Sequence, residues 1–381
     1  MWNRRHFLQS AVVASSALAL RGFPGARLLA EDKPGVAPFG DPVVFSGTPH
    51  ERGRAYGRHF ANAIRGFLDR EIYDVFVGHP NSKEELMSYA AGCKTVIREA
   101  CPIIAQELEG MAEGSGLSLD EHVLITLHEE LYHRSTLPLV PHCTAVGVSP
   151  PVTSGQTLIG QTWDWMQSVA GMSTMLEWSR DDGPSVLAYA FPGLWIGAGI
   201  NSAGLALCWT SAGPNGKLHM PRVGLPSYVL LSHLLYQTSL DEVQRVAKQN
   251  RHAGWFTFVM GDAEGRLLNV EGSPEGITCE ESKGQLIRVG FGTRERTSTT
   301  ANESPPLHPR CKLVEQRLAT QQGKFDLTSL QATFSTPEAG ICVGKNTIDL
   351  MVFDTAKRKA FLSRGSDYGV SWREYAFTKT R

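Results

Sequence analysis

The residues of this sequence best suited to chemistry are a cysteine and an aspartate that two predicted strands would bring together. Cys143 opens the alternating run Thr144 to Val148, a turn is expected at Ser154-Gly155, and residues 157–165 are predicted to return as the second strand of a hairpin. Hairpin pairing would place Asp164 beside Cys143. A thiol next to a carboxylate can serve as a nucleophile, although an isolated cysteine is more often a small buried apolar residue.

The residues around Cys143 form an ordered pattern: Cys-Thr, a hairpin, then Gly-Gln-Thr-Trp-Asp-Trp at residues 160–165. This pattern resembles the penicillin acyltransferase family of N-terminal-nucleophile hydrolases, which is related to choloylglycine hydrolases and acid ceramidase. Further short segments match the family in the same order, namely residues 46–57, 107–116, 201–206, 261–265 and 349–375 with Ser363-Arg364-Gly365. The resemblance implies an α+β fold, a four-layer αββα sandwich preceded by a helical N-terminal pro-segment, and chemistry without a cofactor or metal.

The resemblance also implies that the chain cuts itself just before the cysteine. Cleavage of the His142–Cys143 bond would give a small chain of residues 31–142 and a large chain of residues 143–381 with the catalytic sandwich. The freed α-amino group of Cys143, with an ordinary pKa of about 7.7 to 8.0, would then act as the base for its own thiol. Asp164 would orient that amino group, the alternative being a turn-capping or salt-bridged aspartate. Family members generally carry glycine where this chain has His142.

The donors of the oxyanion hole are where this sequence departs from the family. The family's asparagines fall at Thr162, near Thr210 and near Gly290, and its arginine falls at Val343. A hydroxyl group can still stabilise a tetrahedral oxyanion, and the loss of one donor typically slows such a reaction about a hundredfold. Thr162, Thr210 and Lys345 are therefore candidate donors, and strand hydroxyls and a surface lysine are equally good interpretations.

The first thirty residues are predicted to be a signal peptide. Residues 3–10, Asn-Arg-Arg-His-Phe-Leu-Gln-Ser, form a twin-arginine motif, and the apolar run Ala11 to Leu20 is too short to span a bilayer stably. A membrane anchor behind a chance arginine pair is the alternative. We expect the twin-arginine export machinery to carry the chain to the periplasm or beyond, with cleavage near Ala30 and no membrane span in the mature form.

The composition is that of an ordinary globular protein. The chain has 381 residues, of which 42% are hydrophobic and 20% charged, and its net charge is −1. Without a basic stripe it lacks the electrostatic footprint of a nucleic-acid-binding protein. Its seven cysteines are an odd number for an exported protein, so at least one is predicted to be free or paired between chains, and no pair has zinc spacing.

Residues 31–142 are predicted to be helical. Capping boxes begin at Thr48, Ser82 and Ser118, and the last of them is expected to start a helix that runs through Leu131. Four residues at the end of that helix have the spacing of metal ligands: His128, Glu129, Glu130 and His133. A solvated or core-edge face is the interpretation we prefer over a metal site.

Beyond Cys143 the chain is predicted to form two antiparallel sheets with helices on their outer faces. Turn residues recur about every ten positions and separate β-branched and aromatic runs. The predicted strands are residues 174–178, 185–191, 205–211, 256–261, 266–271, 287–291, 347–353 and 359–363. Helices are predicted at residues 227–236, 240–249 and 310–320, which satisfies the layer rule for such sheets.

Two classes of function compete for this chain. The first is an exported, self-processed amide hydrolase or acyltransferase that cleaves or transfers the acyl group of an N-acylated small molecule through a thioester on Cys143. The second is a non-catalytic binding or structural descendant of the same fold. The retained Cys-Thr and Trp-Asp-Trp favour the enzyme, and an unprocessed thiol peptidase is a distant third. Four tryptophans suggest an apolar acyl pocket or simply a core: Trp163, Trp165, Trp195 and Trp209.

Overall fold

The computed structural model describes residues 36–135, 137, 143–212, 221–290 and 307–378. The predicted signal peptide, residues 1–30, and His142 lie outside the described residues, so the predictions about them stay predictions. Residues 38–381 form one compact unit. Within the described part, no helix is both long and apolar enough to cross a bilayer.

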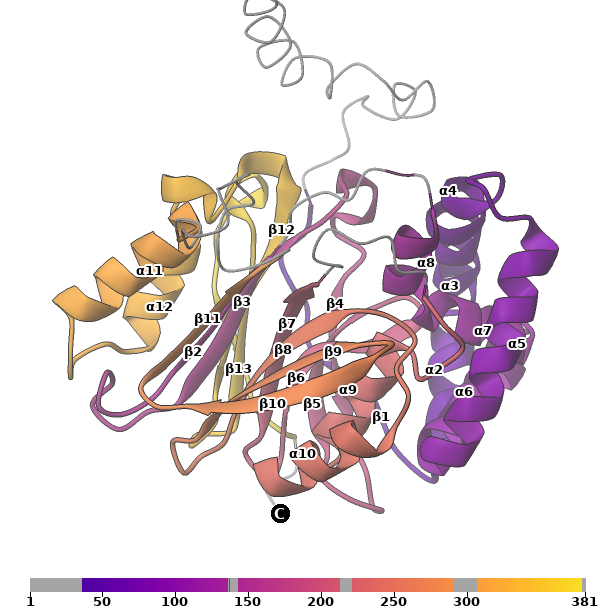
Figure 1. Cartoon of the computed structure of the whole chain (residues 1–381), viewed down its shortest axis with the longest axis horizontal. Coiled ribbons are helices and arrows are strands. Elements are labelled where there is room, and N and C mark those ends of the chain that lie inside the picture. Colours follow the sequence, from indigo (N-terminus) through magenta and orange to yellow (C-terminus); the bar gives the residue numbers. More distant parts are fainter. Residues whose placement is uncertain (1–35, 136, 138–142, 213–220, 291–306, 379–381) are drawn as a thin grey trace, which may run out of the picture. The chain divides into compact units, whose positions relative to one another are not determined.

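Two β-sheets form the centre of this unit and face each other (Figure 1). The first has eight strands in the order β1-β4-β5-β6-β7-β8-β9-β10, and the second has six in the order β11-β2-β3-β12-β13-β14. The strands of the first sheet are β1 (Val43–Phe45), β4 (Thr174–Trp178), β5 (Val186–Phe191), β6 (Leu194–Asn201), β7 (Ala206–Ser211), β8 (Phe256–Gly261), β9 (Leu267–Ser273) and β10 (Gly276–Ser282). Those of the second are β11 (Gln285–Val289), β2 (Thr144–Val148), β3 (Leu158–Asp164), β12 (Thr347–Asp354), β13 (Lys359–Arg364) and β14 (Arg373–Tyr375).

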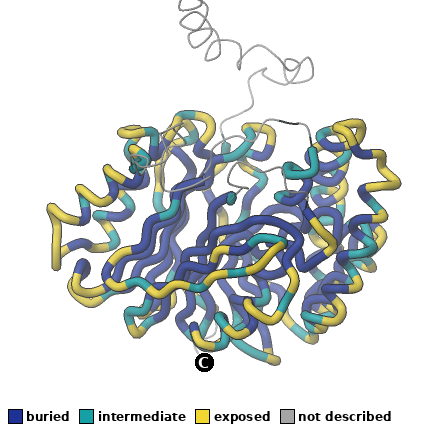
Figure 2. Tube along the Cα trace, viewed as in Figure 1, coloured by how far each residue is buried: buried dark blue, intermediate teal, exposed yellow. Residues whose placement is uncertain are grey.

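Helices cover the outer faces of both sheets. The helices α9 (Ser227–Leu235) and α10 (Leu240–Gln249) pack on the eight-stranded sheet, and α11 (Pro309–Thr320) and α12 (Leu327–Phe334) pack on the six-stranded sheet. Figure 2 shows most strands of both sheets buried, the edge strand β10 largely exposed, and exposed residues along α11. The predicted α+β fold with its αββα layers is therefore confirmed.

The segment before Cys143 is mainly helical, as predicted. Its helices are α2 (Pro49–His59), α3 (Ala61–Phe67), α4 (Asp74–Phe76), α5 (Lys83–Ala100), α6 (Pro102–Ser115), α7 (Leu119–Thr126) and α8 (His128–Arg134), with a π-helix at Leu68–Tyr73. Capping boxes at Thr48, Ser82 and Ser118 begin α2, α5 and α7. All three predicted helix starts are confirmed.

Glycines bring α2 and α6 unusually close together. A Cβ added to Gly53 would lie 2.0 Å from the carbonyl oxygen of Glu107, and one added to Gly57 would lie 2.3 Å from that of Met111. Gly110 meets the backbone of α2 in the same way. A side chain at these positions would force the two helices apart, so the family-like glycine segments serve this contact.

Several details differ from the predictions. The N-terminal segment also contains the short strand β1, which pairs in parallel with β4, so the first sheet is not wholly antiparallel. The helix expected to run through Leu131 breaks at Leu127, whose φ of −90° and ψ of 9° are not helical. The strand β6 was not predicted because it is buried along its whole length and contains two glycines, which removes the polar alternation of a half-buried strand. The edge strands β10 and β14 and the helix α12 are also additional to the prediction.

Candidate active site around Cys143

Cys143 lies at the start of β2, where the hairpin brings it beside the end of β3. Thr144 pairs with Thr162 across the hairpin, so Cys143 lies opposite the residues that follow Thr162. The Sγ of Cys143 is 3.9 Å from the backbone oxygen of Asp164. The predicted approach of the two residues is confirmed. Cys143 is only 6% exposed and has a φ of 31°, a left-handed conformation that is costly for a residue with a Cβ. The peptide unit at Cys143 is therefore strained.

Two hydrogen bonds fix the backbone carbonyl of Cys143, and its surroundings control the pKa of its thiol. The N–H of Gly290 donates to the carbonyl oxygen of Cys143 at 3.1 Å, and the hydroxyl of Thr210 donates to the same oxygen at 3.4 Å. Burial raises the pKa of the Cys143 thiol, and the charge of Asp164 raises it further. The thiol is consequently neutral in the uncut chain and needs a base before it can attack.

The carboxylate of Asp164 is fixed by three side chains from different parts of the chain. Arg310 donates from α11 to Oδ2 at 2.7 Å, Thr347 donates to Oδ1 at 2.6 Å, and the hydroxyl of Thr162 provides a further hydrogen bond. Burial raises the pKa of Asp164, while Arg310 and the hydroxyls oppose that rise. Arg310 was not among the predicted site residues, because nothing in its local pattern links it to a hairpin far away in the sequence.

The three predicted oxyanion donors are placed differently from one another. The Oγ1 of Thr162 accepts the N–H of Thr144 at 3.0 Å and its hydroxyl hydrogen-bonds to Asp164, so it is occupied within the hairpin. Thr210 faces the backbone of Cys143. Lys345 is exposed, and the described contacts connect it only to Tyr368 through its backbone oxygen. Of the three, only Thr210 is directed at the cysteine.

Gln161 is a site residue that the sequence reasoning did not single out. Its Oε1 accepts the backbone N–H of Trp209 at 2.9 Å, which fixes the orientation of the amide. Its Nε2 is buried and makes no well-formed hydrogen bond to the described residues, although it comes close enough to the Cys143 sulfur for a weak hydrogen bond that lowers the pKa of the thiol. A buried amide donor without a partner beside a nucleophile is a ready donor for an oxyanion. The signal that could have found it is its place in the family-like Gly-Gln-Thr-Trp-Asp segment.

Aromatic side chains from the end of the hairpin and from β7 lie together. Trp163 and Trp165 are stacked with ring centroids 5.3 Å apart, and Trp209 meets Trp163 edge-on at 5.9 Å. Trp195 instead donates to Tyr236 and does not join this group. Three of the four tryptophans proposed for an apolar pocket thus form one group, whose members flank Asp164 and precede Thr210 in the sequence, and Trp165 is partly exposed.

The four residues with metal-ligand spacing separate into different environments. In the part of the chain that the structure describes, no group of three or more histidine, cysteine, aspartate or glutamate side chains could hold a metal ion. His128 and Glu130 are completely buried, so a solvated or core-edge face was the wrong interpretation for them. Glu129 remains partly exposed and interacts with Ser211 and Cys143.

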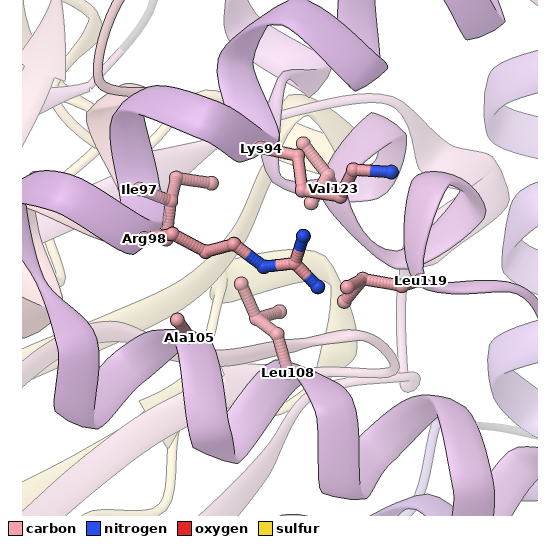
Figure 3. Close-up of a pocket in the computed structure, with 7 residues that line it drawn as sticks. All are labelled: Lys94, Ile97, Arg98, Ala105, Leu108, Leu119 and Val123. Atoms are coloured by element: carbon pink, nitrogen blue, oxygen red, sulfur yellow. The ribbon is translucent and has the colours of Figure 1, made fainter.

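A shallow hollow between α5, α6 and α7 is a separate feature (Figure 3). Its lining residues are Lys94, Ile97, Arg98, Ala105, Leu108, Leu119 and Val123. Aliphatic side chains and two cations line it, and it contains no nucleophile. We therefore place the chemistry at Cys143 and not in this hollow.

Comparisons with known proteins identify acyltransferase relatives of this chain. Residues 152–310 match the family described as acyl-coenzyme A:6-aminopenicillanic acid acyl-transferase. The chain is 25% identical over 255 residues to the 40 kDa form of acyl-coenzyme A:6-aminopenicillanic-acid-acyltransferase from Emericella nidulans, covering 65% of this chain and 68% of that protein. The predicted resemblance is therefore confirmed. The matched residues include Gln161, Asp164 and Arg310 but begin after Cys143.

Solved structures with a similar arrangement include two amide hydrolases. A mutant of the conjugated bile acid hydrolase from Clostridium perfringens has a TM-score of 0.39 and 13% identity, over 62% of this chain and 98% of that one. Penicillin V acylase from Agrobacterium tumefaciens has a TM-score of 0.42 and 14% identity, over 62% and 86%. The family match and the curated relative are acyltransferases, in line with the predicted enzyme class.

Proposed function

We propose that this protein is an exported, self-processed N-terminal-nucleophile enzyme that moves the acyl group of an N-acylated small molecule through a thioester on Cys143. The observation that carries the proposal is the meeting of three groups at the start of β2: the Cys143 thiol, the unpartnered amide of Gln161 and the fixed carboxylate of Asp164. A buried donor alone would also suit a binding protein, whereas a donor beside a buried thiol in a strained backbone suits a nucleophile.

Self-processing would begin at the strained peptide unit of Cys143. The thiol attacks the carbonyl carbon of His142, the S–C bond forms, and the C–N bond to Cys143 breaks with its nitrogen taking up the thiol proton. The product is a thioester of His142 on Cys143, which water hydrolyses to the His142 carboxylate, the thiol and a free α-amino group. The left-handed φ of Cys143 supports this proposal, because strain in the reactant is released when the bond breaks.

The same thiol would then act on the substrate. The α-amino group of Cys143 removes the thiol proton, sulfur attacks the acyl carbon, and the leaving amine receives that proton as the acyl-thioester forms. Water or an acceptor amine then takes the acyl group from sulfur. Asp164 is suited to hold the ammonium form, because Arg310 joins its carboxylate to the hydroxyl of Thr144, the residue next to that amino group.

The small chain would stay bound to the large chain after the cut. The strand β1 belongs to the eight-stranded sheet, and the hydroxyl of Tyr56 on α2 both donates to the oxygen of Phe191 and accepts the N–H of Gly193. These contacts join residues before and after position 143. We therefore expect a two-chain enzyme and not a released pro-peptide.

Trapping the acyl-enzyme tests the proposed function. The purified protein is mixed with N-acyl amides of increasing acyl length, quenched in acid within the first turnovers, digested and analysed by mass spectrometry. We expect the acyl mass on the peptide that contains Cys143. Turnover of any of these amides without that adduct, or no turnover of any of them by correctly cut protein, would contradict the proposal.

We also propose export by the twin-arginine route, on the strength of the Arg4-Arg5 motif. Changing Arg4 and Arg5 together to lysine should leave the precursor in the cytoplasm, as judged by cell fractionation. The matched control changes Arg21 and Arg27 to lysine, which alters the leader equally but spares the motif. Unaltered export of the Arg4→Lys, Arg5→Lys chain would refute this route.

A further inference from the structure

A carboxyl group and a phenol hydroxyl lie next to the nucleophile and have no part in the chemistry above. Glu129 comes from α8, its carboxylate hydrogen-bonds to Ser211, and it interacts electrostatically with the Cys143 thiol. Ser211 follows Thr210, the residue whose hydroxyl touches Cys143. Tyr228 on α9 interacts with both Glu129 and Cys143. Glu129 therefore belongs to the immediate surroundings of the thiol.

The hydroxyl of Tyr228 is buried and can still form a hydrogen bond. Tyr228 is 1% exposed, and its hydroxyl has no hydrogen-bond partner among the described residues. A buried hydroxyl without a partner costs on the order of 1–3 kcal/mol, so it is normally satisfied in the working state. A bound molecule with an N–H group would satisfy it.

Glu129 is more accessible than its neighbour Glu130, as a residue that binds a ligand has to be. Glu130 is completely buried and accepts both the N–H of Ser227 at 2.9 Å and its hydroxyl at 2.6 Å, so it caps the start of α9. Glu129 keeps part of its side chain exposed. Burial raises its pKa to about 7, and the neighbouring Glu130 adds to this rise. A cation brought next to it would be bound more tightly as the carboxyl ionises.

We propose that Glu129 and Tyr228 receive a positively charged amino group of the substrate, so that the enzyme prefers N-acyl compounds that carry a free amine. The proposal deepens the proposed function and rests on it for the position of the scissile bond. The ammonium would donate to the Glu129 carboxylate and to the oxygen of Tyr228, and the stacked tryptophans would take the apolar part of the molecule. Glu129 is thus a specificity-determining residue and forms no bond to the reacting atoms.

The test compares three N-acyl amides of matched size. The first is hexanoyl propylamide, the second carries an ammonium at the end of the amine half, and the third carries it at the end of the acyl half. We expect one charged compound to exceed the neutral one in kcat/KM by about tenfold, mainly through KM. In Glu129→Gln the ratio of kcat/KM for the charged over the neutral compound should fall to about one.

The pH dependence of the preference is a second readout. The ratio of kcat/KM for charged over neutral substrate cancels the titration of the Cys143 amine and thiol. Because Glu129 is neutral below its pKa of about 7 and ionised above it, the ratio should rise from about pH 6 to about pH 8 and be flat in Glu129→Gln. The titratable groups that interact with Glu129 are Glu130, Cys143, Tyr132 and Tyr228. None of these is altered in the variant.

Two variants keep the proposal falsifiable. Glu130→Gln changes the neighbouring carboxyl and should lower the melting temperature, while the preference measured above about pH 8, where Glu129 is ionised with or without Glu130, should stay. Glu129→Asp keeps the negative charge but moves it one methylene group further from the substrate, so it should give an intermediate preference. This variant tests the proposal if Glu129→Gln does not fold. An equal preference in wild type and Glu129→Gln, or no preference for either charged compound, would overturn the proposal.

Binding separates this proposal from the proposed function. The three ketone analogues, in which CH2 replaces the scissile nitrogen, cannot be cut, and their dissociation constants are measured calorimetrically. Tighter binding of a charged ketone that is lost in Glu129→Gln, together with no cleavage of any amide, would support the amine site and contradict the enzyme. Cleavage of the amides without any charge preference in binding would support the enzyme and contradict the amine site.

Discussion

Two buried carboxylates, Glu107 and Asp164, have similar partners and very different surroundings. Glu107 on α6 is completely buried and accepts from Arg52 at 2.8 Å, from the indole of Trp178 at 2.8 Å and from the hydroxyl of Tyr236 at 2.7 Å. Asp164 is likewise held by an arginine and hydroxyls. Next to Asp164, however, lie a nucleophile and donors without partners. The three donors that reach Glu107 are instead each hydrogen-bonded to its carboxylate.

This difference indicates that the charge of Glu107 stabilises the fold and that the charge of Asp164 takes part in the chemistry. A satisfied buried network fixes one arrangement of the chain, and its loss leaves uncompensated charge. Unsatisfied buried donors cost stability and persist where a ligand or transition state will use them. Glu107 joins helices before position 143 to Trp178 and Tyr236 after it, so we interpret its cluster as the clamp between the two proposed chains.

The largest effect is expected from Cys143→Ala. If the thiol performs both reactions, this variant should be a folded single chain without any activity, because one sulfur atom is removed from a small site. Gel electrophoresis, an amide hydrolysis assay and a thermal melt check this. Cys311→Ala is the matched control: it removes a buried thiol from the inner face of α11 and should be cut and active. Retained amide hydrolysis in Cys143→Ala would show that another residue is the nucleophile and would contradict the proposed function.

Asp164→Asn should lower kcat about a thousandfold with a modest loss of stability. The amide keeps the size and most hydrogen bonds of the carboxylate but removes the charge that would hold the α-ammonium of Cys143. Steady-state kinetics and urea unfolding of the same preparation separate the two effects. Normal kcat with a large loss of stability would instead make Asp164 a second structural charge like Glu107.

Glu107→Gln should show the opposite pattern. It leaves Arg52 buried with only the partly exposed Asp182 as a charged partner, so the free energy of unfolding should fall by about 3 kcal/mol while the folded fraction stays active. Glu109→Gln on the same helix breaks an exposed pair with Arg98 and should change stability by less than about 0.5 kcal/mol. Equal effects of the two variants would contradict the clamp.

Gln161→Glu is expected to give the smallest of these effects, about a hundredfold in kcat with KM nearly unchanged. Glutamate keeps an acceptor for the N–H of Trp209 but replaces the amide donor by an oxygen that repels an oxyanion. Pre-steady-state acylation rates measure this directly. Unchanged acylation would move the oxyanion hole away from Gln161, with Thr210 as the next donor to test.

Much of the fold and the centre of the site could be predicted from the sequence. Cys143 and Asp164 come together through a short hairpin, which alternation and a turn signal suffice to predict, and capping boxes mark helix starts because their hydrogen bonds are local. Arg310 is 146 residues from Asp164, and no local period records such a contact. Glu129 and Tyr228 were not predicted as a pair for the same reason, since they come from separate helices whose packing alone joins them to Cys143.

The central claim is that Cys143 becomes an N-terminal nucleophile. Intact-mass spectrometry of the purified, active protein tests it most directly, because it measures both chains without a substrate. We predict two noncovalently associated chains, one that ends at His142 and one that begins with Cys143 and carries a free α-amino group. A single uncut chain with full amide-cleaving activity would contradict the account.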